Sequence, residues 1–299
     1  MSNLKNTTSS SVIFLLTGVP GLEAFHSWIS IPFCFLYATA LSGNSLVLFA
    51  IVTQPSLHEP MYYFLSMLST TDLGLEISFN ACLSQMFFIK FFTVMESSVL
   101  LAMAFDRFVA ISDPLRYAII LTDSRITQIG VAIVIRGVGV LTLTPMVALL
   151  TRLSYCRSRV LHHSYCFHPD VMKLSCTDTR LNNAVGLTAM ISTVGVDSIL
   201  IPCSYVLIIK TILSIASPEE RKKAFSTCIS HIGAVAIFYI PLISLSFVHR
   251  FGKWAPAYVH TMIANTYLLI PPVMNPIIYS VKTKQIRRAV IKILHSKDT

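Results

Sequence analysis

The stretch CLSQMFFIKFFTVMESSVLLAMAFDRFVAIS occupies residues 82–112 and is the strongest indication of the fold class. Its apolar run is long enough to cross a bilayer, because about 20 helical residues span the roughly 30 Å of hydrocarbon. A helix also satisfies its own backbone hydrogen bonds, which lipid cannot do. The acid–base pair Asp106-Arg107 near the end of the run indicates a membrane exit. We therefore predict a transmembrane helix from Cys82 to Ser112.

Working outward from this helix, the chain contains six more apolar runs. With residues 82–112, the predicted spans are Trp28–Val52, Met61–Ile77, Cys82–Ser112, Ile126–Leu150, Ala184–Ser214, Lys223–Val248 and Tyr258–Ser280. The composition agrees, since 54% of the 299 residues are hydrophobic, only 12% are charged, and the mean hydropathy is +0.68. These values exclude an ordinary soluble domain. The predicted fold class is an all-α bundle of seven transmembrane helices.

The predicted topology is one domain over residues 1–299. It divides into an extracellular N-terminus at 1–27, the helix bundle at 28–280, and a cytoplasmic tail with an amphipathic helix at 281–299. Lysine and arginine concentrate in the odd connections and the tail, which places those segments in the cytoplasm, although the second outer loop is also basic. Asn6 begins an Asn-Thr-Thr glycosylation acceptor that works only outside the cytosol; the alternative is a chance match in a polar segment.

The net charge of +9 does not indicate nucleic-acid binding. The basic residues flank the predicted spans and are not interleaved with aromatic residues on a soluble face. Membrane topology and lipid headgroups explain the charge better.

Four of the seven cysteines lie on the predicted outer side: Cys82, Cys156, Cys166 and Cys176. An oxidising compartment favours their pairing. Four cysteines allow three connectivities, and their spacing does not choose among them.

Ionisable residues inside the spans are informative, because each is costly in lipid and needs a partner or water. They are Asp72, Glu96, Arg136 and Asp197. Asp72 and Glu96, with Asn44 and Asn275, present oxygen ligands suited to a small hard cation such as sodium. A neutral hydrogen-bonded network and a proton relay remain open as alternatives.

Several motifs, spread over nearly the whole chain, resemble those of odorant receptors of the rhodopsin-like superfamily. They are GN at 43–44, LHEPMYYFL at 57–65, MAFDRFVAISDPLRY at 103–117, KAFSTC at 223–228 and PPVMNPIIYS at 271–280. A second set resembles the class I, fish-like branch and its subfamily 51: GVPGLE at 18–23, HSYC at 163–166, VHRFG at 248–252 and SVKTKQI at 280–286.

This resemblance implies a receptor and not an enzyme, with no cofactor; the sodium ion considered above is the one candidate ion. The implied ligands are small polar volatiles such as carboxylic acids. The implied partners are membrane lipids and a stimulatory olfactory G protein that raises cyclic AMP from the plasma membrane. By analogy, Cys82 pairs with Cys166, and Cys156 with Cys176.

The resemblance also implies a ligand site at Arg250, His168, Ser246 and Lys90. A guanidinium presents a fork that matches a carboxylate, so Arg250 is the expected anchor; alternatively, it is a headgroup-facing charge at a helix end. Lys90 stands where close relatives tend to have histidine. It either adds a second cationic anchor or repels Arg250, and the sequence does not decide between these.

The implied switch is at the cytoplasmic ends of the helices. There Asp106 holds Arg107 in the resting receptor, Tyr279 belongs to the same switch, and the sixth span opens on activation.

One departure from the family pattern is large. Only ten steps separate Asp72 from Cys82, where family members carry roughly one and a half dozen residues more, about the length that completes a helix and a loop. We therefore predict a shortened second helix and first outer loop. A misfolded or non-signalling product is the alternative function that follows.

Transporters and channels are the rival classes. A transporter would be expected to show inverted repeats or discontinuous helices in both halves, and a channel would need a filter loop or rings of charge. Neither pattern is evident in the sequence.

Overall fold

The computed structural model describes residues 15–16, 26–53, 82–143, 145–154, 160–161, 165–252, 254–282 and 288. The architecture is a bundle of helices, and the all-α prediction is confirmed. A single exception within the described residues is a parallel pair of two-residue strands, β1 (Leu15–Leu16) and β2 (Val160–Leu161), with Leu15 opposite Val160.

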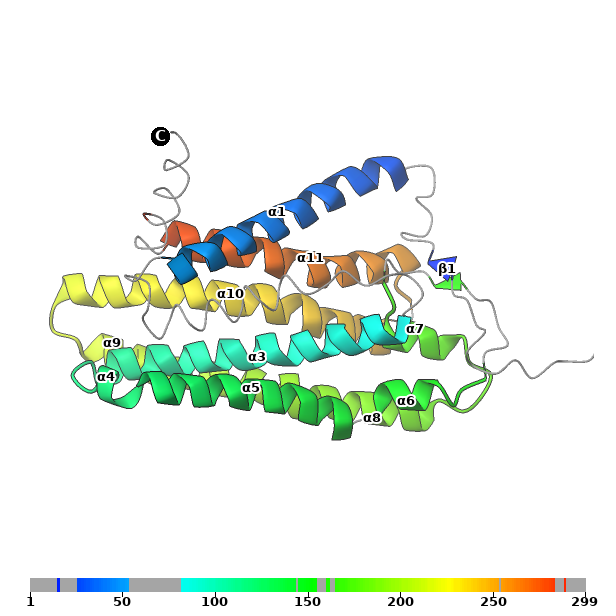
Figure 1. Cartoon of the computed structure of the whole chain (residues 1–299), viewed down its shortest axis with the longest axis horizontal. Coiled ribbons are helices and arrows are strands. Elements are labelled where there is room, and N and C mark those ends of the chain that lie inside the picture. Colours follow the sequence, from blue (N-terminus) through cyan, green and yellow to red (C-terminus); the bar gives the residue numbers. More distant parts are fainter. Residues whose placement is uncertain are drawn as a thin grey trace, which may run out of the picture.

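Six long helical segments in the described part correspond to six of the seven predicted spans, and they run along a common direction (Figure 1). They are α1 (His26–Thr53), α3 (Cys82–Ser112), α5 (Asp123–Leu143), α8 (Arg180–Met190) continued by the π-helix η5 (Ile191–Gly195) and α9 (Val196–Ser214), α10 (Pro218–Phe251) and α11 (Ala257–Lys282). The predicted second span, with its expected shortening, lies outside the described residues, as does Asn6.

The helix ends follow from local chemistry. Helix α3 begins and ends at the predicted residues, whereas α10 starts five residues before the predicted Lys223. Ser217 caps α10 by accepting a hydrogen bond from the backbone amide of Glu220. Glu219 and Glu220 in the first turn also match the positive end of the helix dipole.

The predicted fourth span, Ile126–Leu150, is formed by two helices in the structure. Helix α5 ends at Leu143, and a separate short helix, α6 (Met146–Leu150), follows with Pro145 as its N-cap. Proline has no amide hydrogen and clashes with the preceding turn, so it separates the two helices.

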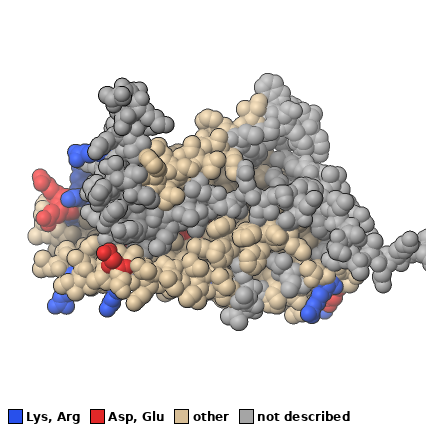
Figure 2. All heavy atoms as spheres, viewed as in Figure 1, with Lys and Arg blue, Asp and Glu red and all other residues tan. Residues whose placement is uncertain are grey.

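Apolar surface and charge are segregated along the bundle. Figure 2 shows one face, on which Lys, Arg, Asp and Glu gather toward the two ends while the described atoms between them are mostly neutral. Three described segments are long and apolar enough to cross a membrane, namely Cys82–Ser112, Arg180–Ser214 and Pro218–Phe251. Large apolar side chains such as Phe35, Ile199 and Phe247 are 60–70% exposed, as expected of a surface that faces lipid.

Helix α3 lies in the core of the bundle. It packs against α5 and α9, while α11 packs against α1 and α10. Gly137 lets α5 approach α3 closely, because an added Cβ would lie 2.8 Å from the Phe91 ring. Small residues commonly serve this purpose between membrane helices, where packing drives association.

Candidate functional site

A cavity of about 60 Å³ lies between α3, α10, α8 and a short helix in the loop before α8, α7 (His168–Lys173). Helix α7 lies at the same end of the bundle as the start of α3, and the short α4 (Tyr117–Ile120) lies at the opposite end (Figure 1). The cavity is lined by Lys90, Met146, Phe167, His168, Pro169, Met172, Asn183, Gly186, Met190, Leu242, Leu245, Ser246, His249 and Arg250. The structure therefore brings all four predicted ligand residues to one cavity.

Arg250 lies one residue before the end of α10. One of its guanidinium nitrogens, Nη1, donates a hydrogen bond to Oδ1 of Asn183 on α8 at 3.1 Å. Among the described residues, Arg250 has no carboxylate partner. Its fork is held at the cavity by a neutral amide and remains available to an acid.

His168 is the most buried polar group of the cavity, with 3% of the residue exposed. Burial, assisted by the positive charge of Lys90 and by His249, lowers the pKa of His168 to about 3. The imidazole is therefore neutral at physiological pH. Its Nε2 is buried and has no hydrogen-bond partner among the described residues, so a polar group within the cavity is unsatisfied.

Ser246 and Lys90 complete the predicted set. The Ser246 hydroxyl donates to the sulfur of Met190 at 2.9 Å, which is a weak acceptor. Lys90, on α3, has neither a hydrogen-bond partner nor a carboxylate partner in the described part of the chain. Lys90 and Arg250 are the only lysine or arginine among the described lining residues, and these include no aspartate or glutamate.

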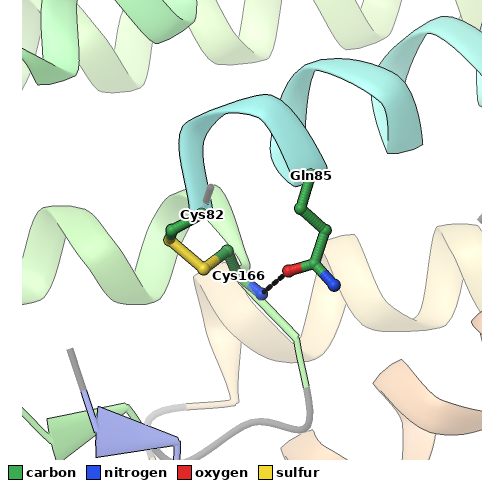
Figure 3. Close-up of a disulfide and its surroundings, with 3 residues drawn as sticks. All are labelled: Cys82, Gln85 and Cys166. Atoms are coloured by element: carbon green, nitrogen blue, oxygen red, sulfur yellow. Dashed lines mark hydrogen bonds between the residues drawn. A yellow bond between two sulfur atoms is a disulfide. The ribbon is translucent and has the colours of Figure 1, made fainter. Parts of the chain in front are cut away.

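A disulfide attaches the outer loop to the beginning of α3. Cys82 is bonded to Cys166, with their Cα atoms 5.4 Å apart, and the backbone amide of Cys166 donates to Oε1 of Gln85 at 3.0 Å (Figure 3). This connection fixes His168 and α7, which follow Cys166 closely, over the cavity. Cys176 is also disulfide-bonded; its expected partner, Cys156, lies outside the described residues.

The candidate sodium ligands are only partly brought together. Asn275 donates to Oε1 of Glu96 at 3.3 Å, so these two residues meet between α3 and α11. Asn44 instead joins α1 to α11 by donating to the Pro272 carbonyl at 2.8 Å, and its Oδ1 is buried with no partner among the described residues. Asp72 lies outside them. In the described part, no group of three or more His, Cys, Asp or Glu residues could hold a metal ion.

The expected switch pair is closed in this structure. Oδ2 of Asp106 accepts hydrogen bonds from Nη2 and Nε of Arg107 at 2.5 and 2.9 Å, and its Oδ1 accepts one from the Tyr117 hydroxyl at 2.7 Å. The Asp106 side chain is 1% exposed and that of Arg107 is 14% exposed. The side chain of Tyr279 lies outside the described part.

One arrangement was not predicted. Arg136 on α5 and Asp197 on α9 were singled out separately as ionisable residues in apolar spans, but the structure pairs them at 2.9 Å. Ser97 on α3 donates to the same carboxylate at 2.6 Å and also contacts the hydroxyl of Tyr239 on α10. The pair could have been predicted from the rule that charged residues inside a membrane usually pair with one another.

The comparisons with known proteins agree with this geometry. A family model described as olfactory receptor matches residues 33–78 and 74–297. The chain belongs to the olfactory receptor family. It is therefore a membrane protein and an odorant receptor that couples to G proteins, not an enzyme.

Individual relatives narrow the assignment. The chain is 79% identical to human olfactory receptor OR51C1 over 311 aligned positions, which cover 98% of this chain and 99% of the relative. It is 58% identical to human olfactory receptor 51F2 and 56% identical to human olfactory receptor 51F1, over 100% and 99% of this chain and 92% and 98% of those relatives. The predicted membership of the class I, subfamily 51 group is confirmed.

The comparisons also mark one discontinuity in this receptor. The alignment with olfactory receptor 51F2 has 318 positions although this chain has 299 residues, so at least 19 positions of the alignment are gaps in this chain. The two segments matched by the family model meet at residues 74–78. This is the place at which the sequence predicted missing residues.

Proposed function

We propose that this olfactory receptor detects small carboxylic acids through Arg250 and raises cyclic AMP through a stimulatory G protein. The observation that carries the proposal is the guanidinium of Arg250, which lines the cavity and has no carboxylate partner among the described residues. Guanidinium binds carboxylate in a bidentate fashion, and such charge-assisted pairs are roughly twice as strong as neutral ones.

The neighbouring groups suit the same ligand. Ser246 offers a hydroxyl whose present partner is only a thioether. The neutral His168 offers a ring nitrogen without a partner in the described part. Leu242, Leu245 and Met146 line the cavity with apolar surface for a short alkyl chain.

Signalling requires the acid to favour the open receptor. A ligand that binds both arrangements equally shifts nothing. Arg250 and Ser246 lie on α10, which also packs against α3, the helix that carries the closed Asp106–Arg107 pair. An acid that pulls the outer end of α10 toward α8 therefore acts on the helix that must open at its inner end.

The experiment is acid-evoked cyclic AMP in cells, normalised to receptor at the surface. Arg250→Ala should lose the response, because nothing else in the described cavity presents a fork. Arg250→Lys should recover only part of it, since an ammonium is a point charge. Arg180→Ala is the matched control, because the Arg180 side chain is 95% exposed on the outer side and does not line the cavity. A full response in Arg250→Ala would refute the anchor assignment.

Further parts of the proposal rest on sequence. The receptor lies in the plasma membrane with its N-terminus outside and glycosylated at Asn6, and its basic tail contacts inner-leaflet lipids. A sodium ion is held by Asp72, Glu96 and Asn275. Asn44 contributes its unsatisfied Oδ1 if α1 and α11 shift. Sodium dependence of surface-receptor stability, compared with Glu96→Gln, tests the last point.

A second candidate is a receptor product that does not signal. It is favoured by the gap of at least 19 positions relative to olfactory receptor 51F2 and by the divided family match at 74–78. A second span that ends near Glu76 is at the lower limit of what crosses lipid.

Surface labelling of an N-terminal epitope in unpermeabilised cells separates the two candidates. The native chain is compared with a variant that carries a family-length insert after Leu75. Labelling of the native chain supports the signalling receptor, whereas labelling only after insertion supports the silent product.

A further inference from the structure

Two cations share the ligand cavity. Lys90 on α3 and Arg250 on α10 both line it, and no aspartate or glutamate is among the lining residues. Both side chains line one cavity of about 60 Å³, so their like charges repel each other. Two like charges in a partly buried site cost free energy unless anions pair with them.

The nearby carboxylates of the described chain are engaged elsewhere. Asp170 pairs with Lys173 at 2.8 Å within α7. Glu96, further along α3, accepts a hydrogen bond from Asn275. Neither residue lines the cavity, so the protein itself, as far as it is described, does not neutralise Lys90 or Arg250.

A single carboxylate would neutralise only one of these cations. The volume of the cavity and its lining residues restrict which anion could pair with both Lys90 and Arg250. At about 60 Å³ the cavity has room for only a few water-sized groups. Met172 and Leu245 offer apolar contact to a short methylene linker, and the unpartnered Nε2 of His168 offers one further hydrogen bond.

We infer that the ligand of this receptor is a short dicarboxylic acid, with one carboxylate on the Arg250 guanidinium and the other on the Lys90 ammonium. This inference rests on the proposed function and sharpens it, because it makes Lys90 the residue that distinguishes dicarboxylates from monocarboxylates. It also combines the two interpretations of Lys90, as a second anchor and as a charge that repels Arg250. The two cations repel each other without a ligand, and a dianion removes this repulsion by pairing with both.

The test measures ligand-induced thermal stabilisation of the full-length, epitope-tagged receptor in cell membranes. This readout requires neither surface delivery nor a G protein. The probes are succinate and glutarate, compared with butyrate and pentanoate of the same chain lengths. The native receptor should be half-saturated by the dicarboxylates at a concentration lower by about tenfold or more.

Three variants and one control assign the effect. Lys90→Gln should remove the preference for dicarboxylates, so that succinate and butyrate are half-saturating at similar concentrations. Lys90→His, which replaces the ammonium by an imidazole with an ordinary pKa near 6.5, should do the same at physiological pH. Arg250→Gln should weaken both classes. Arg180→Gln removes an exposed outer charge and should change neither.

Each outcome is decisive. Stabilisation by monocarboxylates without a preference for dicarboxylates overturns the inference and leaves the proposed function standing. A preference that survives Lys90→Gln also overturns it. Stabilisation by neither class overturns both. Dicarboxylates and monocarboxylates are compared on the native receptor without any variant. The inference can therefore be refuted even if a Lys90 variant fails to fold.

Discussion

Arg136 on α5 forms two hydrogen bonds with the carboxylate of Asp197 on α9, from Nη1 to Oδ2 at 2.9 Å and from Nη2 to Oδ1 at 3.1 Å. The Asp197 side chain is 1% exposed, and that of Arg136 is 29% exposed. Arg136 also donates to Ser98, and Ser97 donates to Asp197. The pair therefore joins three helices in the apolar part of the bundle, where an unpaired charge is costly.

The first prediction concerns this pair. Asp197→Leu should lower the free energy of unfolding by about 3 kcal/mol, the lower end of the range for breaking a buried pair, because Arg136 is partly exposed. The double variant Arg136→Met with Asp197→Leu should recover most of the loss, since no charge is left unpaired. Thermal unfolding of the detergent-solubilised receptor measures both.

The exposed Arg116 supplies the control for this prediction. Its side chain is 74% exposed, so Arg116→Gln should change stability by less than about 0.5 kcal/mol. A double variant as unstable as Asp197→Leu alone would show that the ion pair is not the source of the loss.

The second prediction concerns the closed switch. Tyr117→Phe removes the hydroxyl that donates to Asp106 at 2.7 Å. A hydrogen bond to a charged group contributes about 1.5 kcal/mol or more, so the ratio of closed to open receptor should fall by roughly tenfold. Ligand-free cyclic AMP per surface receptor should rise accordingly.

Tyr258→Phe, at the outer end of α11, is the control for this change, because Tyr258 is 49% exposed and far along the chain from the switch. Basal signalling that stays at the native level in both Tyr117→Phe and Asp106→Asn would count against a holding role for Asp106.

The third prediction concerns pH. The pKa of folded His168 is about 3, whereas an unfolded histidine has a pKa near 6.5. Below about pH 6.5 the unfolded chain therefore binds the extra proton, and stability falls as the pH decreases from there toward 3. Between pH 7.5 and 5.5 the loss due to His168 should be about 1 kcal/mol.

His168→Gln keeps a neutral polar group of similar reach and removes the titration. Comparing the shift of the unfolding temperature between pH 7.5 and 5.5 in the two proteins isolates the histidine. An equal shift in both would mean that His168 has the same pKa in the folded and unfolded receptor, and that burial does not lower it.

The fourth prediction concerns the outer loop. Cys82→Ser and Cys166→Ser should each reduce folded receptor strongly, since loss of a native disulfide costs about 2–5 kcal/mol. The double variant should be no worse than either single one, because the two thiols belong to one bond. Gln85→Ala, which removes only the hydrogen bond to the Cys166 amide, should cost about 1 kcal/mol. Folded receptor in native membranes, assayed by ligand-independent protease resistance, distinguishes these levels.

Much of the fold could be predicted because its signals are local. Helix α3 begins at Cys82 and ends at Ser112 as the apolar run predicts, and the length of such runs is set by bilayer thickness. The break at Pro145 was missed because apolar residues continue on both sides of it. Pro145 was the available signal for the break. A proline alone does not predict a helix break, however, because Pro202 and Pro241 lie within continuous helices.

The candidate site was predictable only through the family resemblance. Arg250, His168, Ser246 and Lys90 lie on three elements far apart in the chain, and no spacing rule connects them. The expected sodium ligands show the limit of that approach: Glu96 meets Asn275, but Asn44 bonds to the backbone of α11 instead.

Consecutive residues alone indicated that the chain crosses a membrane as helices and belongs to the olfactory receptor family, because apolar length, charge and motif order are local properties. The tertiary structure alone decided that Arg136 meets Asp197, that Arg250 is held by an amide, and that Lys90 faces the same cavity. These contacts join helices separated by many residues, and they depend on how each helix is rotated and packed against its neighbours, which no local pattern specifies.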